Sequence, residues 1–185
     1  MTIELRLQDA PIINKKVYGI TYMGLLSRLL GNKQGANDKK WSKGKSKSFE
    51  LMAKLHSKVQ QGENVRVLGV DDNVVNNKVL KAMIEKMGYE YTSAISGQQA
   101  LDIYTQSSSF DLILMDCEMP GMDGYEATSK LRSLEASKKN APIPIVAVTG
   151  NVLESDKTKC FNAGMNDFIN KPVKLEKLKE LIEGR

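Results

Sequence analysis

The sequence has few residues of the types that form zinc sites or disulfide frameworks. Its 185 residues include two cysteines, Cys117 and Cys160, and a single histidine, His56. The cysteines lack the spacing and the companion histidines of a metal site, and a fold held by disulfides would need more of them. We therefore expect both cysteines to be reduced thiols.

The sequence also lacks a membrane-spanning run and a secretion signal. No apolar stretch approaches the roughly 20 residues that cross a bilayer, and the N-terminus has no basic, apolar and small-residue cleavage pattern. With 41% hydrophobic and 26% charged residues, the composition is that of a globular protein. Its length suits one domain of roughly 100 to 150 residues with an appendage. The expected location is the cytoplasm.

Acidic residues are scarce in the first third of the chain and common in the rest. Residues 1–60 hold 12 lysines and arginines against 4 acids, a net +8, whereas residues 61–185 hold 15 against 18, a net −3. A basic segment suits nucleic acid or an anionic membrane, but a solvated linker has the same composition. We favour the linker, and nucleic-acid binding by this tail is the alternative.

From residue 65 onward, short apolar runs alternate with longer amphipathic stretches. This alternation is typical of repeated βα units and a parallel sheet. The five predicted strands cover residues 65–70, 90–94, 110–115, 143–148 and 167–169. The predicted fold class is α/β: a doubly wound five-stranded parallel sheet flanked by helices in three layers, with a basic N-terminal extension.

Apolar residues recur at helical spacing between these strands. They are Val75, Val79, Ala82, Met83 and Met87 in the first connection, Ala100, Leu101 and Tyr104 in the second, and Ala127, Leu131 and Leu134 in the third. Gly88 and Gly164 are expected to end the first and fourth helices, where a left-handed residue is common. A last helix is predicted over residues 173–182, with Pro172 at a tolerated first-turn position.

The N-terminal extension is less regular. Ile3, Leu5 and Leu7 alternate like a short strand, and residues 18–30 could form a helix. Residues 31–48 are rich in Gly, Lys, Ser and Asn, which predicts a flexible connector.

Four apolar residues at helical spacing precede the first predicted strand: Phe49, Met52, Leu55 and Val59. Either packing against the core or a dimer contact would explain this pattern. We therefore divide the chain into an N-terminal basic extension and linker, residues 1–60, and a domain, residues 61–185.

Polar residues follow four of the predicted strands. Asp71 and Asp72 follow the first, and Asp116 follows the third. Thr149 follows the fourth strand, and Lys171 lies two residues beyond the fifth. Because ligands of open α/β sheets bind outside the carboxyl ends of the strands, we expect these side chains on one rim. Three neighbouring acids repel one another unless a cation compensates, and Mg²⁺ is the usual ion where a phosphoryl group completes the shell.

Each of these residues also has a simpler explanation by itself. Asp72 or Asn73 could cap the helix that follows. Asp116 could be a loop acid, Thr149 a strand terminator and Lys171 a solvated lysine before proline. All of them nevertheless fall on the same edge, in the order that a single site requires, which favours one site.

Four segments together resemble the response regulator receiver domain. They are residues 66–73 (RVLGVDDN), 114–124 (LMDCEMPGMDG), 146–151 (VAVTGN) and 168–173 (FINKPV). The second motif, with Cys117, is most similar to receivers of hybrid sensor histidine kinases. The resemblance covers about two-thirds of the chain. It implies a CheY-like, flavodoxin-like strand order of 2-1-3-4-5 and a role as a phosphoacceptor in two-component phosphorelay.

The resemblance also implies a role for each residue of the rim. Asp116 matches the phosphoacceptor, whose carboxylate attacks a phosphohistidine and forms an aspartyl phosphate. The side chains of Asp72 and Asp116 and the backbone carbonyl of Glu118 would bind Mg²⁺. Asp71 would act on the ion mainly through bound water. Lys171 would balance charge on the phosphoryl oxygen opposite the metal.

Two further residues would carry the response to phosphorylation. The hydroxyl of Thr149 would donate to a phosphoryl oxygen, which would let Phe168, at the family's aromatic switch position, rotate inward. Plain core packing is the alternative for Phe168. Gly69 stands where a β-branched residue is common in the family, and Gly150 where alanine is more usual. Each glycine weakens its element by up to about 1 kcal/mol.

The chain is not expected to be a kinase, because it lacks the nucleotide-binding glycine boxes. We expect a phosphoacceptor that catalyses its own phosphotransfer and slow dephosphorylation, with a sensor histidine kinase and a histidine phosphotransfer protein as partners. His56 lacks the surroundings of a phosphodonor and is expected to be a partly exposed helical residue. Since the chain ends at Arg185, no C-terminal DNA-binding domain is expected. Both a stand-alone protein and part of a hybrid kinase fit this pattern.

An alternative of another class is a phosphatase of the haloacid dehalogenase type. Asp116 and Glu118 resemble its aspartate nucleophile with a second acid two residues later. That family places its nucleophile on the earliest strand, whereas Asp71 and Asp72 precede Asp116 here. The receiver is therefore favoured.

Overall fold

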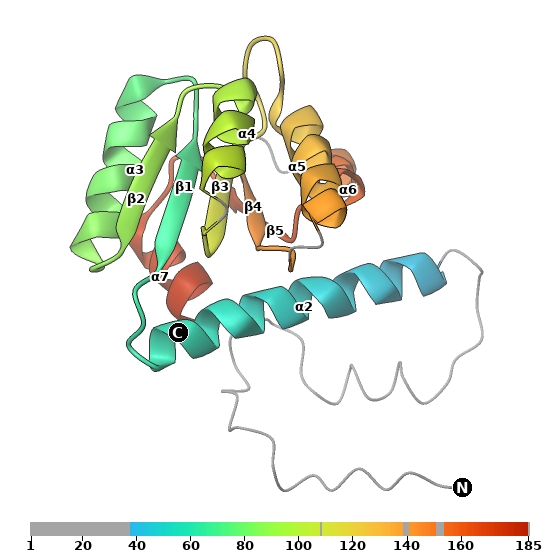
Figure 1. Ribbon diagram of the computed structural model, residues 1–185, viewed down its shortest axis with the longest axis horizontal. Helices are drawn as coiled ribbons and strands as arrows, with labels where there is room; N and C mark the ends of the chain where they lie inside the picture. Colours follow the sequence, from blue (N-terminus) through green and yellow to red (C-terminus); the bar gives the residue numbers. More distant parts are fainter. Residues whose placement is uncertain (1–37, 108, 139–140, 151–153, 185) are drawn as a thin grey trace, which may run out of the picture. The chain divides into compact units, whose positions relative to one another are not determined.

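The structure, a computed structural model, describes residues 38–107, 109–138, 141–150 and 154–184 (Figure 1). Its strands are β1 (Arg66–Val70), β2 (Glu90–Ala94), β3 (Leu112–Asp116), β4 (Ile145–Thr149) and β5 (Asp167–Asn170). Its helices are α2 (Asp38–Gln60), α3 (Val74–Lys86), α4 (Gly97–Gln106), α5 (Gly124–Lys138), α6 (Glu154–Ala163) and α7 (Leu175–Glu183). The strand predicted near residue 5 and the helix predicted over residues 18–30 lie outside the described residues. No helix in these ranges is long and apolar enough to span a bilayer.

The five strands form one parallel sheet in the order β2-β1-β3-β4-β5, which confirms the predicted fold class and strand order. The predicted bounds of β2 are confirmed, and the other strands differ by one or two residues. Val65, for example, is fully buried although it precedes β1. Such residues fill the core just outside the strand, so an apolar run can start before the strand does. The strand order reverses between β1 and β3, where ligands of such sheets bind.

Two apolar clusters lie on opposite faces of the sheet. In β1, Leu68 and Val70 belong to one cluster and Val67 to the other, because side chains alternate along a strand. Helices α4, α5 and α6 contribute to the first cluster, with Tyr104 and Leu131 among its fully buried side chains. Helices α3 and α7 cover the second cluster (Figure 1). The three predicted layers are therefore present.

Helix α3 buries a different face from the one that its valines suggest. Asn77, Leu80 and Ile84 are buried, whereas Val75 and Val79 are 65% and 45% exposed. Apolar residues occur on two sides of this helix, and the sheet covers the side with the larger leucine and isoleucine. The helix was therefore predicted correctly; of its predicted apolar residues, Met83 and Met87 pack against the second cluster, whereas Val75 and Val79 do not face the core.

Helix α2 belongs to the same compact unit as the sheet. The flexible connector predicted over residues 31–48 is therefore wrong from residue 38 onward. Met52 and Leu55 are buried in the second cluster, whereas Phe49 is 52% exposed. Core packing thus accounts for Met52 and Leu55. Extending a docked helix costs less than nucleating one, so a polar stretch can continue it.

Helix α2 follows the edge at which the strands begin. Lys58 forms an ion pair of 2.7 Å with Asp111, just before β3. The hydroxyl of Ser48 accepts a hydrogen bond of 3.1 Å from Asn166, just before β5. His56, half-buried as expected, has Nε2 2.9 Å from the carbonyl oxygen of Leu181 in α7. These contacts join α2 to three parts of the domain.

The last helix begins two residues later than predicted, at Leu175. Pro172 lies before it and follows Lys171 through a cis peptide bond, so the first-turn placement of this proline is wrong. Gly88 and Gly164 have φ angles of 84° and 99° and follow their helices as predicted. Left-handed backbone of this kind favours glycine.

Candidate functional site

Neighbouring strands bring polar side chains to one edge of the sheet. Asp71 follows β1, Asp116 ends β3 and Thr149 ends β4. Lys171 follows β5, and its amide donates to the carbonyl of Thr149 at 2.8 Å. Asp71, Asp116 and Thr149 are only 1%, 3% and 4% exposed. The rim predicted from the strand ends is therefore present, and its acceptor groups are largely shielded from water.

The three acids of the rim form one compact cluster. Asp71, Asp72 and Asp116 each offer a carboxylate oxygen, and these oxygens lie within 4.8 Å of one another. Asp71 and Asp116 are buried, whereas Asp72 is exposed. Hard oxygen donors at this spacing fit a small divalent cation such as Mg²⁺. The donor set therefore fits the predicted ion.

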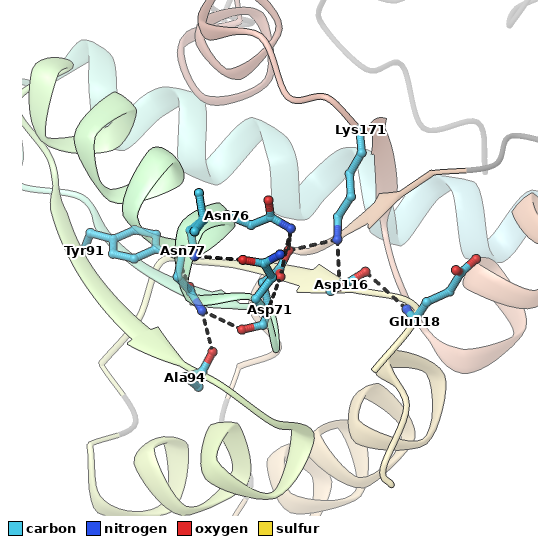
Figure 2. A network of polar contacts seen from close by, with 10 residues as sticks. Asp71, Asn76, Asn77, Tyr91, Ala94, Asp116, Glu118 and Lys171 are labelled. Carbon is cyan, nitrogen blue, oxygen red and sulfur yellow. Dashed lines mark hydrogen bonds and ion pairs between the residues drawn. The ribbon is translucent and has the colours of Figure 1, made fainter. Parts of the chain in front are cut away.

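Lys171 reaches the cluster from the end of β5. Its Nζ lies 2.7 Å from Asp116 Oδ2 and 2.9 Å from Asp71 Oδ2, so one ammonium bridges two buried carboxylates (Figure 2). Burial alone would lower the pKa of Lys171, but its hydrogen bonds with Asp116 and Asp71 outweigh burial and raise it. Lys171 is therefore a fixed positive charge in the site at neutral pH.

Asp116 is poorly stabilised as an anion. Burial raises the pKa of its carboxyl group above the ordinary value, although hydrogen bonds from Lys171 and from the backbone amide of Glu118 oppose this rise. The Glu118 amide lies 3.2 Å from Asp116 Oδ1. One lysine thus does not fully offset the cost of burying this charge beside Asp71. A further cation at the cluster would favour the ionised form.

The chain turns tightly after the central acid. The amide of Gly124, at the start of α5, donates to the carbonyl of Cys117 at 3.2 Å. A Cβ atom at Gly124 would overlap the carbonyl oxygen of Asp116. Only glycine therefore lets α5 begin this close to the end of β3.

Asp71 is held by asparagines that sequence reasoning did not assign to the site. Asn73 accepts a hydrogen bond of 2.8 Å from the amide of Val75, so Asn73 rather than Asp72 caps α3. Asn76 Nδ2 lies 3.1 Å from both carboxylate oxygens of Asp71. An Asn-Asn pair in the first turn of α3 was the available signal, and it does not reveal which side chain faces the acids.

The cysteines and Phe168 lie on the first-cluster side of the sheet. Cys117 and Cys160 are buried free thiols, as predicted, with their sulfur atoms 4.0 Å apart. The neighbouring Cys160 sulfur and burial raise the pKa of Cys117, so Cys117 is a neutral thiol. Phe168 is half-buried against the cluster, and the Nζ of Lys157 lies 5.3 Å from its ring centroid. Its role as a switch stays a prediction.

Comparisons with known proteins match this architecture. The response regulator receiver domain matches residues 67–183. The hybrid signal transduction histidine kinase L of Dictyostelium discoideum is 40% identical over 145 residues, which cover 77% of this chain and 8% of the relative. The sensor protein GacS of Pseudomonas syringae pv. syringae is 38% identical over 117 residues, covering 63% and 13%. The chain thus spans a small part of the length of these curated relatives.

Solved structures give the same result. The receiver domain of the histidine kinase CKI1 from Arabidopsis thaliana, complexed with Mg²⁺, is 37% identical with a TM-score of 0.57, covering 65% of this chain and 90% of that one. A chain of the Saccharomyces cerevisiae co-crystal structure of the histidine phosphotransfer protein Ypd1 with the Ssk1 receiver domain is 34% identical with a TM-score of 0.61, covering 64% and 86%. Because the family match covers more than half of its residues, the chain belongs to the response regulator receiver domain family of two-component signalling.

Proposed function

We propose that Asp116 is the residue of this chain that accepts a phosphoryl group from a phosphohistidine. The observation that carries the proposal is the cluster of three carboxylates within 4.8 Å, two of them bridged by Lys171. A carboxylate oxygen of Asp116 forms a bond to phosphorus while the phosphorus–nitrogen bond of the donor breaks. The imidazole leaves with the bonding electron pair, and an aspartyl phosphate results.

The same cluster supports a Mg²⁺ requirement. The side chains of Asp72 and Asp116 and the backbone carbonyl of Glu118 would hold the ion, with Asp71 acting through water. When bound, the ion supplies charge neutralisation for the transferred phosphoryl group. Lys171 would contact a phosphoryl oxygen from the side of β5. Its ammonium already lies 2.7 Å from the acceptor carboxylate, so little reorganisation is needed.

The response to phosphorylation would start at Thr149. Its hydroxyl would donate to a phosphoryl oxygen, and the end of β4 would follow it toward the acceptor. Because the Lys171 amide donates to the Thr149 carbonyl at 2.8 Å, a shift of Thr149 would also move the end of β5. Phe168, half-buried in β5, would then turn inward and change the surface around α6 and β5.

A histidine phosphotransfer protein is the proposed docking partner, and a sensor histidine kinase the proposed source of the phosphoryl group. Four apolar side chains near the acidic pair are exposed: Val74 (53%), Val75 (65%), Val79 (45%) and Ile95 (53%). An apolar surface that borders a reactive site suits a transient protein contact. The receiver in the Ypd1 co-crystal structure is similar to this chain, which supports this class of partner.

Phosphorylation assays test the proposal directly. Acetyl phosphate, or a phosphotransfer protein phosphorylated on histidine, should label the chain stoichiometrically when Mg²⁺ is present. Asp116→Asn should remove the label. Asp102→Asn changes an exposed acid on α4 in the same way and should leave labelling intact.

Two outcomes would contradict the proposal. Labelling of Asp116→Asn would place the acceptor elsewhere. Repeated turnover of phosphate esters, without a stoichiometric aspartyl phosphate, would indicate the phosphatase alternative instead.

A further inference from the structure

Gly69 of β1 lies against the side chain of Tyr91 of β2. A Cβ atom at Gly69 would overlap the phenol ring and the hydroxyl of Tyr91. Gly150, the other glycine that departs from the family pattern, has open space around it. Gly69 therefore has a specific role, because a larger residue would displace the Tyr91 ring.

The hydroxyl of Tyr91 has a buried partner in α3. Tyr91 Oη donates to Asn77 Oδ1 at 2.7 Å (Figure 2). Asn77 is 5% exposed, and its Nδ2 donates to the carbonyls of Asp71 at 2.6 Å and Ala94 at 3.0 Å. Since carbonyls only accept, the amide nitrogen must face them, and the amide oxygen then faces Tyr91. The orientation of Asn77 is thereby fixed.

Tyr91 keeps the proton that it donates. Burial and the nearby charge of Asp71 raise the pKa of Tyr91 above its ordinary value. The phenol therefore stays neutral throughout the range in which the acids are ionised. If the Tyr91 hydroxyl were removed, Asn77 Oδ1 would be a buried acceptor without a donor, which is unfavourable.

These hydrogen bonds hold the turn that carries the acidic pair. The amide of Asp71 donates to the carbonyl of Ala94 at 3.1 Å, and the carbonyl of Asp71 accepts from Asn77. Both backbone groups of Asp71 are therefore tied to the end of β2, directly or through Asn77. Asp72 is the next residue, so the same bonds restrict where its carboxylate can lie.

We propose that Tyr91 is a positioning residue that acts through Asn77 to set the geometry of Asp71 and Asp72 for the divalent ion, and that Gly69 makes room for it. This inference rests on the function proposed above, and it adds three residues that touch neither the ion nor the phosphoryl group. Partners that orient metal ligands influence ion affinity strongly even without contacting the ion.

Tyr91→Phe tests the inference, since it retains the ring and removes only the hydroxyl. The dissociation constant for Mg²⁺, measured by calorimetry on the unphosphorylated full chain, should rise about tenfold. Hydrogen exchange of the Asp71 amide should become faster. Tyr89→Phe is the matched control, because Tyr89 packs on the same cluster but precedes β2 at the opposite edge. Neither quantity should change in this control.

A double-mutant cycle tests whether Tyr91 acts through Asn77. Asn77→Leu removes the amide at similar size and should weaken Mg²⁺ binding, and adding Tyr91→Phe should weaken it no further. Additive effects would overturn the inference. So would wild-type Mg²⁺ affinity in Tyr91→Phe, even with a lower melting temperature, since the tyrosine would then serve packing only. If Asn77→Leu does not fold, the Mg²⁺ affinity of Tyr91→Phe and the hydrogen exchange of its Asp71 amide still test the inference.

The result separates this inference from the function on which it rests. Failure of the wild-type chain to bind Mg²⁺ or to be labelled at Asp116 would defeat the proposed function. A wild-type chain that does both, alongside an unaffected Tyr91→Phe, would defeat only the positioning role.

Discussion

At the edge where the strands begin, the charged side chains of Arg132 and Glu135 pair with each other, whereas at the edge where the strands end two buried carboxylates share one lysine. At the first edge, Arg132 donates to Glu135 at 2.7 Å and to the carbonyls of Ile143 and Gly164 at 2.9 and 3.0 Å. At the second edge, Asp71 and Asp116 share the ammonium of Lys171. The same sheet therefore has one edge at which Glu135 has a cation of its own and one edge at which two buried acids depend on a single cation.

This difference separates stability from function within one fold. The first edge is further covered by α2, which buries Met52 and Leu55. The second edge instead leaves Val75 and Ile95 exposed beside its acids. Variants at the first edge should therefore change the free energy of unfolding irrespective of ions. Variants at the second edge should have effects that depend on a bound cation.

The largest expected effect comes from the core contact of α2. Leu55 is 3% exposed in the cluster that contains Leu178 and Ile182. Leu55→Ala should lower the free energy of unfolding by about 2 to 4 kcal/mol, because it removes buried apolar surface and leaves a cavity. Urea denaturation measures this change. Phe49→Ala, on the same helix at a 52% exposed position, should cost less than about 1 kcal/mol.

The ion affinity of the same variant tests the separation of the two edges. Folded Leu55→Ala should bind Mg²⁺ as tightly as the wild-type chain, since its cavity lies at the opposite edge. A large loss of affinity would mean that α2 and the acidic cluster are coupled.

An intermediate effect is expected when a lysine is replaced by methionine, and the same replacement can be made separately at each edge. Without Mg²⁺, Lys171→Met should lower the free energy of unfolding by about 1 to 3 kcal/mol, because two buried carboxylates lose their ammonium. Saturating Mg²⁺ should recover much of this loss. Lys58→Met breaks the pair with Asp111, whose side chains are 25% and 19% exposed, and should cost about 1 kcal/mol or less.

The small effect expected for the Lys58→Met control has a structural reason. Asp111 also accepts a hydrogen bond of 2.8 Å from the amide of Arg66, so it keeps a partner in Lys58→Met. In thermal melts, the rise in melting temperature on adding Mg²⁺ should therefore be larger in Lys171→Met than in wild type, and it should be the same in Lys58→Met as in wild type. Equal dependence on Mg²⁺ at both edges would remove the distinction.

The sequence predicted the sheet and the acidic rim for a clear physical reason. Buried parallel strands appear as short apolar runs, and polar residues just after them must lie at one edge of the sheet. Asp71, Asp116, Thr149 and Lys171 could therefore be placed together without knowledge of their contacts. The roles of these residues in phosphotransfer stay predictions until the labelling assays are done.

The features that could not be predicted all depend on contacts between distant segments. The composition of residues 38–48 suggests a linker, and only the docked part of α2 shows why that stretch is helical. Gly69 was expected to weaken its strand, and its match with Tyr91 appears only when β1 and β2 pair. Asn77 faces inward because its side chain forms hydrogen bonds there with backbone carbonyls and with the phenol of Tyr91. Helical periodicity, which counts apolar residues, points to another face.

The smallest expected effect concerns Asp167, which begins β5 at the first edge. Burial raises the pKa of this carboxyl, although its hydrogen bond from the Phe168 amide at 2.8 Å opposes the rise. A raised native pKa means that the folded chain holds this proton more tightly than the unfolded chain. The resulting stability is complete below the ordinary pKa of 3.8 and is lost as pH rises through the native value.

Asp167→Asn cannot ionise, so it should be more stable than the wild-type chain at neutral pH, by less than about 1 kcal/mol. The difference should shrink to zero below pH 3.8, where both side chains are neutral. Urea denaturation across this pH range measures it, with Asp102→Asn at an exposed position as control. A variant that is less stable at neutral pH would show that the ionised carboxylate is satisfied at this edge. Asp167 would then fit the pattern of Asp111 instead of departing from it.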